Sequence, residues 1–261
     1  MVSAPGPDGR VAVVTGGTRG VGAGIARAFL RAGTEVVVCA RRPPGRPVAA
    51  AGRTARFLPV DLREPAAVQA LFDQVAGDHG RLDVLVNNAG GTPHRRLDEA
   101  DPERHLRVID LNLTAALTAS LAAHRLMRGR RGGGCVLMVG SVSGTRPSPG
   151  TAAYGAAKAG LENLARTMAV EWAPAVRVNT LVLGMVRTES AAAHYGDAHG
   201  VAAVARTVPA GRLAEPDEIG EAAVFLASDR AAYITGASLL VHGGGERPAF
   251  LDAAHTDHGE P

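Results

Sequence analysis

The sequence feature that most constrains the fold is a glycine-rich turn between a strand-like run and a helix-like run. Val11–Val14 is a short apolar run typical of a buried strand, and Thr15–Gly22 follows it with glycines at positions 16, 20 and 22. Val21 and Ile25 then begin an apolar stripe at helical spacing. Such a turn brings free backbone N–H groups and the positive end of the helix dipole to one point. It therefore predicts a phosphate site, with a plain tight turn as the alternative.

Strand-like and helix-like runs alternate along the rest of the chain. The further strand-like runs are Val36–Cys39, Phe57–Val60, Asp83–Val86, Val136–Val139, Val176–Leu183 and Ser238–Val241. Helical spacing of apolar residues predicts connecting helices, one of which runs up to about Met127, whereas residues 43–54 are rich in Pro and Gly and indicate a plain connection. The alternation predicts an α/β protein of the doubly wound Rossmann type. We expect a seven-stranded parallel sheet with helices on both faces and ligands at the carboxyl ends of the strands.

The length and composition of the chain fit a single domain. The 261 residues are 46% hydrophobic, which provides a core, and the chain has no long Pro- or Ser-rich linker. We expect a flexible tail at residues 1–9 and a single Rossmann-fold domain at residues 10–245, with a lid at about 186–212. The C-terminal tail at 246–261 contains Phe250 and Leu251, which are candidates for docking on a neighbouring subunit.

The charge pattern and the cysteines argue against several classes of protein. The net charge of +3 comes from interspersed acids and bases, which is not typical of a nucleic-acid-binding protein. The sequence contains neither an apolar run of about 18 residues nor a signal peptide, so we expect no membrane association. Cys39 and Cys135 lie in strand-like runs without metal or disulfide spacing, which indicates reduced packing residues in a cytoplasmic protein.

A second cluster of residues is suited to proton transfer. Tyr154 and Lys158 are four residues apart in a helix-like run and therefore share one face, while Ser141 follows a strand-like run. A phenol has a pKa of about 10 and needs a positive charge nearby to favour its anion. Lys158 is the only lysine among 28 lysines and arginines. The cluster suits proton transfer to or from a C–O group, although an ordinary surface Tyr/Lys pair has the same spacing.

Taken together, these motifs resemble those of the short-chain dehydrogenases/reductases of the single-domain type, in particular actinobacterial oxidoreductases. The likeness extends from Val11 to Gly245 and includes the T-G-x-x-x-G-x-G form of the glycine turn and the N-N-A-G element at Asn87–Gly90. It implies the strand order 3-2-1-4-5-6-7, a nicotinamide cofactor and a small carbonyl or alcohol substrate. It also implies a homodimer or homotetramer in which the helix containing Tyr154 pairs with its mate.

The resemblance implies a role for individual residues. Ser141 would hold the substrate oxygen and Tyr154 would transfer the proton. Lys158 would lower the pKa of the tyrosine and hold the nicotinamide ribose, and Asn112 would bend its helix and complete a water relay. No metal is needed for this chemistry. The expected cofactor residues are Gly16, Thr18, Arg19, Gly20, Val21, Gly22, Arg41, Asp61, Leu62, Asn88, Ala89, Gly90, Tyr154, Lys158, Gly184, Val186 and Thr188.

The end of the second strand-like run predicts the choice of cofactor. A carboxylate there would bind the ribose 2′-hydroxyl and select NAD, but the chain has Ala40, Arg41 and Arg42. Arg41 and Arg19 can form charge-assisted hydrogen bonds with a 2′-phosphate, so we expect NADP(H) rather than NAD(H). Solvated arginines are the alternative. By resemblance Asp61 contacts the adenine amino group, although an acid at a helix start would look the same.

The substrate is less constrained by the sequence than the cofactor is. Leu183 and His242 stand where the family usually has Pro and Asp, which leaves the geometry of these turns open. The expected lid is rich in small residues, with His194 and Tyr195 as its polar candidates, and predicts a hydrophobic ketone or alcohol of the steroid-like, polyketide or 3-oxoacyl type. One alternative is a cofactor-binding regulator or scaffold without turnover. Another is a sugar epimerase or dehydratase of the same fold, which usually has an added substrate domain.

Overall fold

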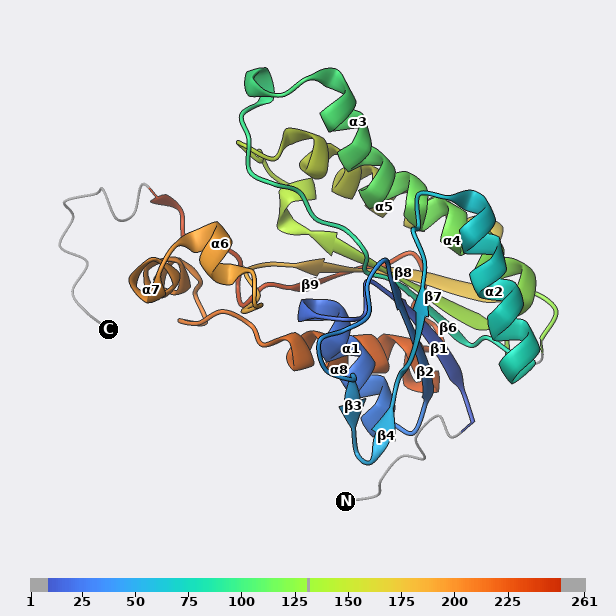
Figure 1. Cartoon of the computed structure of the whole chain (residues 1–261). Helices are drawn as coiled ribbons and strands as arrows, with labels where there is room; N and C mark the ends of the chain where they lie inside the picture. Colours follow the sequence, from blue (N-terminus) through green and yellow to red (C-terminus); the bar gives the residue numbers. More distant parts are fainter. Residues whose placement is uncertain (1–8, 131, 250–261) are drawn as a thin grey trace.

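The computed structural model describes residues 9–130 and 132–249, and its main feature is one parallel sheet covered by helices (Figure 1). The strands are β1 (Val11–Thr15), β2 (Glu35–Ala40), β5 (Arg56–Pro59), β6 (Val84–Asn87), β7 (Gly134–Ser141), β8 (Val176–Leu183) and β9 (Ser238–Val241). They lie in the order β5-β2-β1-β6-β7-β8-β9, and every neighbouring pair is parallel. Counted along the chain, this is the expected order 3-2-1-4-5-6-7. The predicted doubly wound α/β fold is therefore confirmed.

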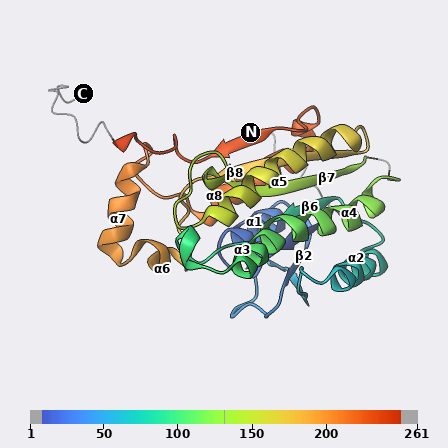
Figure 2. The ribbon, with the colours of Figure 1, turned by 90° about the horizontal axis from the view of Figure 1, so that it is seen from above.

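Helices cover both faces of this sheet (Figure 2). They are α1 (Gly20–Arg31), α2 (Pro65–His79), α3 (Pro102–Ile109), α4 (Ala115–Met127), α5 (Ala152–Glu171), α6 (Ala191–Tyr195), α7 (Ala198–Thr207) and α8 (Pro216–Ala227). Short 3-10 turns lie at Leu97–Glu99, Val142–Gly144 and Asp229–Ala231. Helices α1 and α8 pack on one face of the sheet, and α2, α4 and α5 pack on the other.

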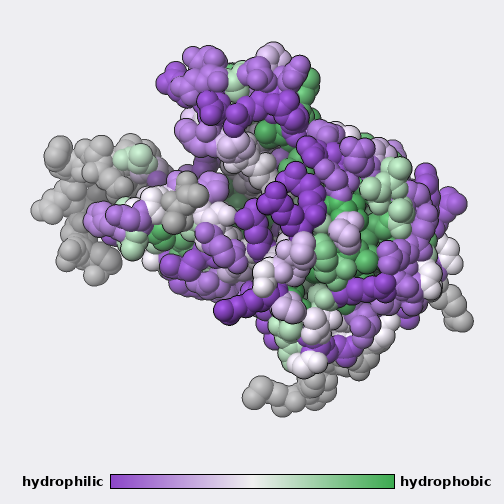
Figure 3. Space-filling view, viewed as in Figure 1, coloured by the Kyte–Doolittle hydropathy of each residue, from purple (hydrophilic) through white to green (hydrophobic). Residues whose placement is uncertain are grey.

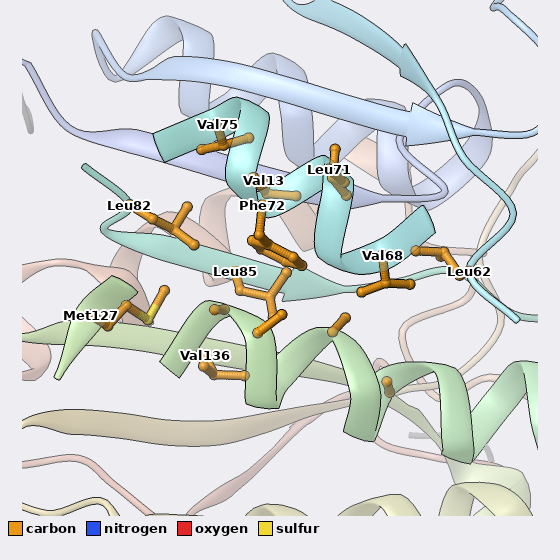
Figure 4. Close-up of a cluster of buried hydrophobic side chains, with 14 of the residues drawn as sticks. Val13, Leu62, Val68, Leu71, Phe72, Val75, Leu82, Leu85, Met127 and Val136 are labelled. Atoms are coloured by element: carbon orange, nitrogen blue, oxygen red, sulfur yellow. The ribbon is translucent and has the colours of Figure 1, made fainter. Parts of the chain in front are cut away.

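The central strands are buried on both faces. In β1, Val13 packs into the core beneath α2, α4 and α5, whereas Val14 packs into the core beneath α1 and α8. Figure 4 shows Phe72 of α2 pointing toward Leu85 of β6 in the first of these cores. Because both faces are covered, these strands are continuous apolar runs rather than alternating ones. The two cysteines are free and buried in these strands, as predicted.

Residues 43–54 differ from the plain connection that the sequence predicted. They contain β3 (Ala49–Ala50) and β4 (Arg53–Thr54), which pair antiparallel as a small hairpin. The two residues between them, Ala51 and Gly52, both have positive φ, at 51° and 73°, as a two-residue hairpin turn requires. The strands are only two residues long, which is too short to show alternation in the sequence.

The long helix expected to run to Met127 is interrupted. A π-turn at Asp110–Thr114 separates α3 from α4, and Asn112 lies within it. Such turns often occur at functional sites because they redirect side chains within a helix. The stretch Pro102–Met127 is long and apolar enough to cross a membrane, but α4 buries several alanines beneath α2 and against the sheet, as a core helix does.

The expected tails lie mostly outside the described residues, which begin at Gly9 and exclude Phe250 and Leu251. The first part of the C-terminal tail is described and is attached to the rest of the chain. The backbone N–H of Arg247 donates to the carbonyl of Thr207 at 3.0 Å, and Glu246 pairs with Arg146. The tail therefore begins beside α7 and the loop that follows β7.

Candidate active site

A cavity of about 870 Å³ lies at the carboxyl ends of the central strands. Every residue of the cofactor set predicted from the sequence lines this cavity. Figure 3 shows the hollow between the lobe that carries α3 and the lobe that carries α6 and α7. Pockets for small ligands and cofactors commonly have volumes of about 300–1,000 Å³, so the space suits a nucleotide cofactor with a small substrate.

The glycine turn forms the floor of the cavity through close backbone approaches. A Cβ on Gly16 would lie 2.9 Å from Ala89 Cα, and one on Gly22 would lie 2.4 Å from Gly16 O. The hydroxyl of Thr15 accepts hydrogen bonds from the N–H groups of Asn88 and Ala89, both at 3.0 Å. The amide of Asn88 donates to the carbonyls of Thr15 and Gly16. These contacts hold the ends of β1 and β6 together at the cavity.

The start of α1 completes a site that fits the phosphates of a dinucleotide. Helix α1 begins at Gly20, directly after the turn, so its first N–H groups and its positive dipole end lie at the cavity. The N–H of Gly20 donates a hydrogen bond to the carboxylate of Glu189 at 3.0 Å, so this N–H group already binds an anionic group. The turn, the helix terminus and the cavity volume together fit a nicotinamide dinucleotide.

Cations gather where the sequence placed the adenosine end of the cofactor. Arg19 and Arg41 line the cavity as expected, and Arg63, which the sequence reasoning missed, lines it as well. Arg63 donates to both carboxylate oxygens of Asp61, at 3.0 and 2.5 Å. These hydrogen bonds with Arg63 are the main reason that the pKa of Asp61 falls to about 2. The spacing of Arg63 two residues after Asp61 was the only signal in the sequence.

The three proton-handling residues come together beside this cavity. Ser141 ends β7, and Tyr154 and Lys158 lie in the first turns of α5. The Nζ of Lys158 donates to the carbonyl of Val139 at 2.7 Å and lies 5.5 Å from the centroid of the Tyr154 ring. Tyr154 and Lys158 line the cavity, and Ser141 reaches it through a hydrogen bond with Tyr154.

Burial shifts the pKa values of two of these groups in opposite directions. It lowers the pKa of Lys158 to about 8. It raises the pKa of Tyr154, against the opposing effect of the hydrogen bond with Ser141, and the nearby Tyr195 raises it further. The pKa of Tyr154 is therefore raised overall, because removing the phenol from water outweighs the hydrogen bond with Ser141. The predicted effect of Lys158 on this pKa stays a prediction. Tyr154 is a neutral proton donor at neutral pH.

Asn112 holds the loop that borders Lys158. Its Oδ1 accepts from the N–H of Gly91 at 2.9 Å, and its Nδ2 donates to the carbonyls of Gly91 and Val108, at 3.0 and 2.9 Å. A Cβ on Gly90 would lie 2.5 Å from this Oδ1 and 3.5 Å from the Nζ of Lys158. Asn112 and Lys158 therefore converge on Gly90, and Asn112 lies in the π-turn that interrupts the predicted long helix. The water relay stays a prediction.

The two departures from the usual family sequence have a structural account. Leu183 pairs with Val241 in the sheet, and the N–H of Gly184 donates to the carbonyl of Val241 at 3.1 Å. The β8–β9 pairing thus continues into the turn without a proline. A Cβ on Gly184 would lie 2.7 Å from the Cβ of His242, so the histidine packs directly on this glycine.

The expected lid contains α6 and α7 and contributes polar side chains to the cavity. The hydroxyl of Tyr195 donates to the sulfur of Met185 at 3.1 Å, and His194 Nδ1 lies 2.8 Å from the carbonyl of Ser190. Both lid candidates line the cavity. The sequence reasoning missed three further charged residues of the lining, Arg104 and Arg107 of α3 and Glu189 of the lid. The spacing of the two arginines on one helix face was their only signal.

Comparison with known proteins identifies the family. Residues 16–246 match the family model described as Enoyl-(Acyl carrier protein) reductase. The 3-oxoacyl-[acyl-carrier-protein] reductase of Escherichia coli (strain K12) is 36% identical over 240 residues, which cover 91% of this chain and 97% of that protein. The cis-4-hydroxycyclohexanecarboxylate dehydrogenase of Sinomonas cyclohexanicum is 39% identical over 241 residues, which cover 90% and 96%.

A solved structure supports the same conclusion at the level of the fold. The ligand-free aldohexose dehydrogenase of Thermoplasma acidophilum superposes with a TM-score of 0.85 and 27% sequence identity, covering 96% of this chain and 97% of that one. Three observations point to the same family: the sheet order, the glycine turn at the start of α1 and the sequence matches over most of the chain. The chain belongs to the short-chain dehydrogenase/reductase family.

Proposed function

We propose that the protein is an NADP(H)-dependent oxidoreductase that transfers hydride between the nicotinamide and a ketone or secondary alcohol. One observation carries the proposal: the neutral phenol of Tyr154 and the buried ammonium of Lys158 border the same cavity as the glycine turn. The family acts on CH–OH and C=O groups, which need a proton donor or acceptor beside the hydride donor.

The geometry supports a role for each group in the reducing direction. The nicotinamide supplies the hydride. Ser141 orients the carbonyl oxygen through its hydroxyl, and Tyr154 gives that oxygen its proton. The resulting phenolate is stabilised by the hydrogen bond with Ser141 and by the ammonium of Lys158. Asn112 holds the Gly90–Gly91 loop in place beside Lys158. The proton that Tyr154 has given away can then be replaced from the side of the phenol where Lys158 lies.

The charges at the adenosine end support the proposed preference for NADP(H). Arg19, Arg41 and Arg63 line the cavity there against a single carboxylate, that of Asp61. Arg63 already binds Asp61 through two hydrogen bonds, which leaves Arg19 and Arg41 to bind a 2′-phosphate. A 2′-hydroxyl would leave the charges of these two guanidinium groups without a counterion.

The substrate proposed is a hydrophobic ketone or alcohol of the steroid-like, polyketide or 3-oxoacyl type. Relatives named for a 3-oxoacyl thioester and for a cyclohexane alcohol support this range. We also propose a cytoplasmic homodimer or homotetramer. Val170 at the end of α5 is 81% exposed and Leu121 of α4 is 46% exposed, so this pair of helices presents apolar side chains that a second copy would cover.

The experiment is a panel of ketones and alcohols assayed by the absorbance of NADPH, with Tyr154→Phe as the matched variant. The variant keeps the ring and loses only the hydroxyl group, so turnover should fall by about 10²–10⁴-fold. Its affinity for NADPH should stay close to that of the wild type. Turnover by the variant at the wild-type rate would exclude Tyr154 as the acid. NADPH binding without turnover of any carbonyl would favour the regulator or scaffold instead.

A further inference from the structure

A carboxylate from the lid binds the first N–H group of α1. The N–H of Gly20 donates to the two carboxylate oxygens of Glu189, at 3.0 and 3.4 Å. A Cβ on Gly20 would lie 3.4 Å from Thr188 Cγ2 and 3.6 Å from Glu189 Oε2. The segment Thr188–Glu189 therefore lies directly against the turn where α1 begins. This contact joins the lid to the phosphate site.

Glu189 is one of two acidic residues in a cavity wall whose other charged groups are mostly cations. Arg19, Arg41, Arg63, Arg104, Arg107 and Lys158 line the cavity, whereas its carboxylates are those of Asp61 and Glu189. Asp61 is bound by Arg63. Within residues 9–130 and 132–249, no arginine or lysine pairs with Glu189, and the partner of its carboxylate is the Gly20 N–H. The helix terminus thus holds an anion that belongs to the protein itself.

A carboxylate and a phosphate group compete for such a donor. Both are attracted by the free N–H groups and the positive dipole end of a helix N-terminus, and they repel each other at short range. A cofactor phosphate that takes the Gly20 N–H therefore requires Glu189 to leave. Glu189 is separated from α6 only by Ser190, and α6 contributes Ala191, His194 and Tyr195 to the cavity wall. Glu189 therefore lies in the lid, close in sequence to the lid residues that line the cavity.

We propose that Glu189 is an internal competitor for the cofactor pyrophosphate and sets the affinity of the protein for its cofactor. Glu189 holds the Gly20 N–H until the cofactor arrives, and it takes the donor back as the cofactor leaves. The contact thereby weakens binding and speeds dissociation, which favours turnover where product release is slow. The inference rests on the proposed function, because it needs a dinucleotide in this cavity.

The test is the affinity of Glu189→Gln for NADPH, measured by fluorescence titration on the full chain. Glutamine keeps the shape and a hydrogen-bond acceptor but removes the charge. We expect the Kd for NADPH to fall about threefold to tenfold. Because affinity differences between variants of one site appear mainly in koff, stopped-flow dissociation should slow by a similar factor. The matched control is Glu171→Gln, an exposed position at the end of α5, which should leave the Kd unchanged.

Two further measurements keep the outcomes distinct. Glu189→Ala also removes the carboxylate and should change the Kd in the same direction, and the NADPH-induced rise in Tm should be larger in both variants than in the wild type. An unchanged or weaker affinity for NADPH in both variants overturns the role of Glu189 and leaves the proposed function intact. Failure of the wild type and of every variant to bind NADPH overturns the proposed function itself.

Discussion

At the scale of single residues, burial decides the proton affinities of Tyr154 and Lys158. Both side chains are removed from water, which lowers the pKa of the lysine and raises that of the phenol. Because the pKa of Lys158 lies only slightly above neutral pH, the lysine still carries its charge there. Tyr154 keeps its proton at the same pH. The pair is ready to donate a proton to a carbonyl, while abstraction of a proton from an alcohol needs a higher pH.

The buried ammonium also has a consequence for stability. The pKa of Lys158 falls from 10.5 to about 8 in the folded protein, so the folded state disfavours the charged form. The resulting penalty is complete below about pH 8 and disappears as the pH rises toward 10.5. Lys158→Met should therefore raise the free energy of unfolding at pH 7 by about 1–3 kcal/mol while abolishing turnover.

Urea denaturation of both proteins at neutral and alkaline pH checks this prediction. The difference between them should shrink as the pH approaches 10.5, because the wild-type lysine is then neutral in both states. A wild type that is the more stable protein at pH 7 would show instead that the hydrogen bond to the Val139 carbonyl outweighs the cost of burying the charge.

Arg41 is predicted to determine the cofactor ratio. Arg41→Asp puts a carboxylate where a 2′-phosphate would bind, so the ratio of kcat/KM for NADPH over NADH should fall at least about tenfold, or 1.4 kcal/mol. Arg42→Asp is the matched control, because Arg42 is next in sequence and does not belong to the cavity wall formed by the described residues. An equal change of the ratio in both variants would indicate a general charge effect rather than a contact with Arg41.

At the scale of elements, the position of the phosphate site depends on the packing of α1 against α8. A Cβ on Gly24 of α1 would lie 2.3 Å from the backbone of Pro216, and one on Gly220 of α8 would lie 2.6 Å from Ala28 Cβ. The two glycines thus let the helices approach closely. Because α1 also provides the N–H groups at its start, this contact positions the anion site as well as the core.

Gly24→Ala should destabilise the protein by about 1–3 kcal/mol, because the new methyl group clashes with backbone that has little room to move. Gly77→Ala is the matched control. Gly77 is exposed within α2, a Cβ there would meet no described atom within 4 Å, and alanine should stabilise the helix by about 0.5–1 kcal/mol. Denaturation midpoints measure both changes, and a neutral Gly24→Ala would contradict the close-packing argument.

At the scale of the whole molecule, the cavity lies where the order of the sheet reverses. From β1 the chain continues to β2, which lies on one side of β1 in the sheet. The second half of the sheet starts with β6, which lies on the other side of β1. The crevice between the two halves is where open α/β sheets bind ligands. The lid and the loop after β7 then close over the same end, and Glu246 of the C-terminal segment is attached there through Arg146.

The exposed apolar side chains of α4 and α5 predict association of the whole chain. Light scattering should show a homodimer or homotetramer at micromolar concentration. Val170→Asp should shift the protein to a smaller species, because a charge within an apolar contact is costly to bury. Glu171→Gln, at the neighbouring exposed position, should leave the mass unchanged. A monomeric wild type would contradict the proposed assembly.

The predictions from the sequence succeeded where the signal was local. The sheet strands, the glycine turn and the i, i+4 relation of Tyr154 and Lys158 were all recognisable from spacing, and the structure contains them. The hairpin within residues 43–54 was missed because its strands are two residues long. Arg63 and Glu189 were missed because their side chains matter through partners and a cavity that spacing alone does not show.

The sequence by itself determined the α/β class, the glycine turn and the positions of the residues proposed to handle the proton, because period, spacing and residue type are properties of short stretches of chain. Only the tertiary structure decided the direction of the Tyr154 pKa shift, the contacts of Asn112 with Gly91 and the hold of Glu189 on α1. These depend on burial and on contacts between residues far apart in the chain. Their free energies are set by the folded environment, which no single stretch of sequence contains.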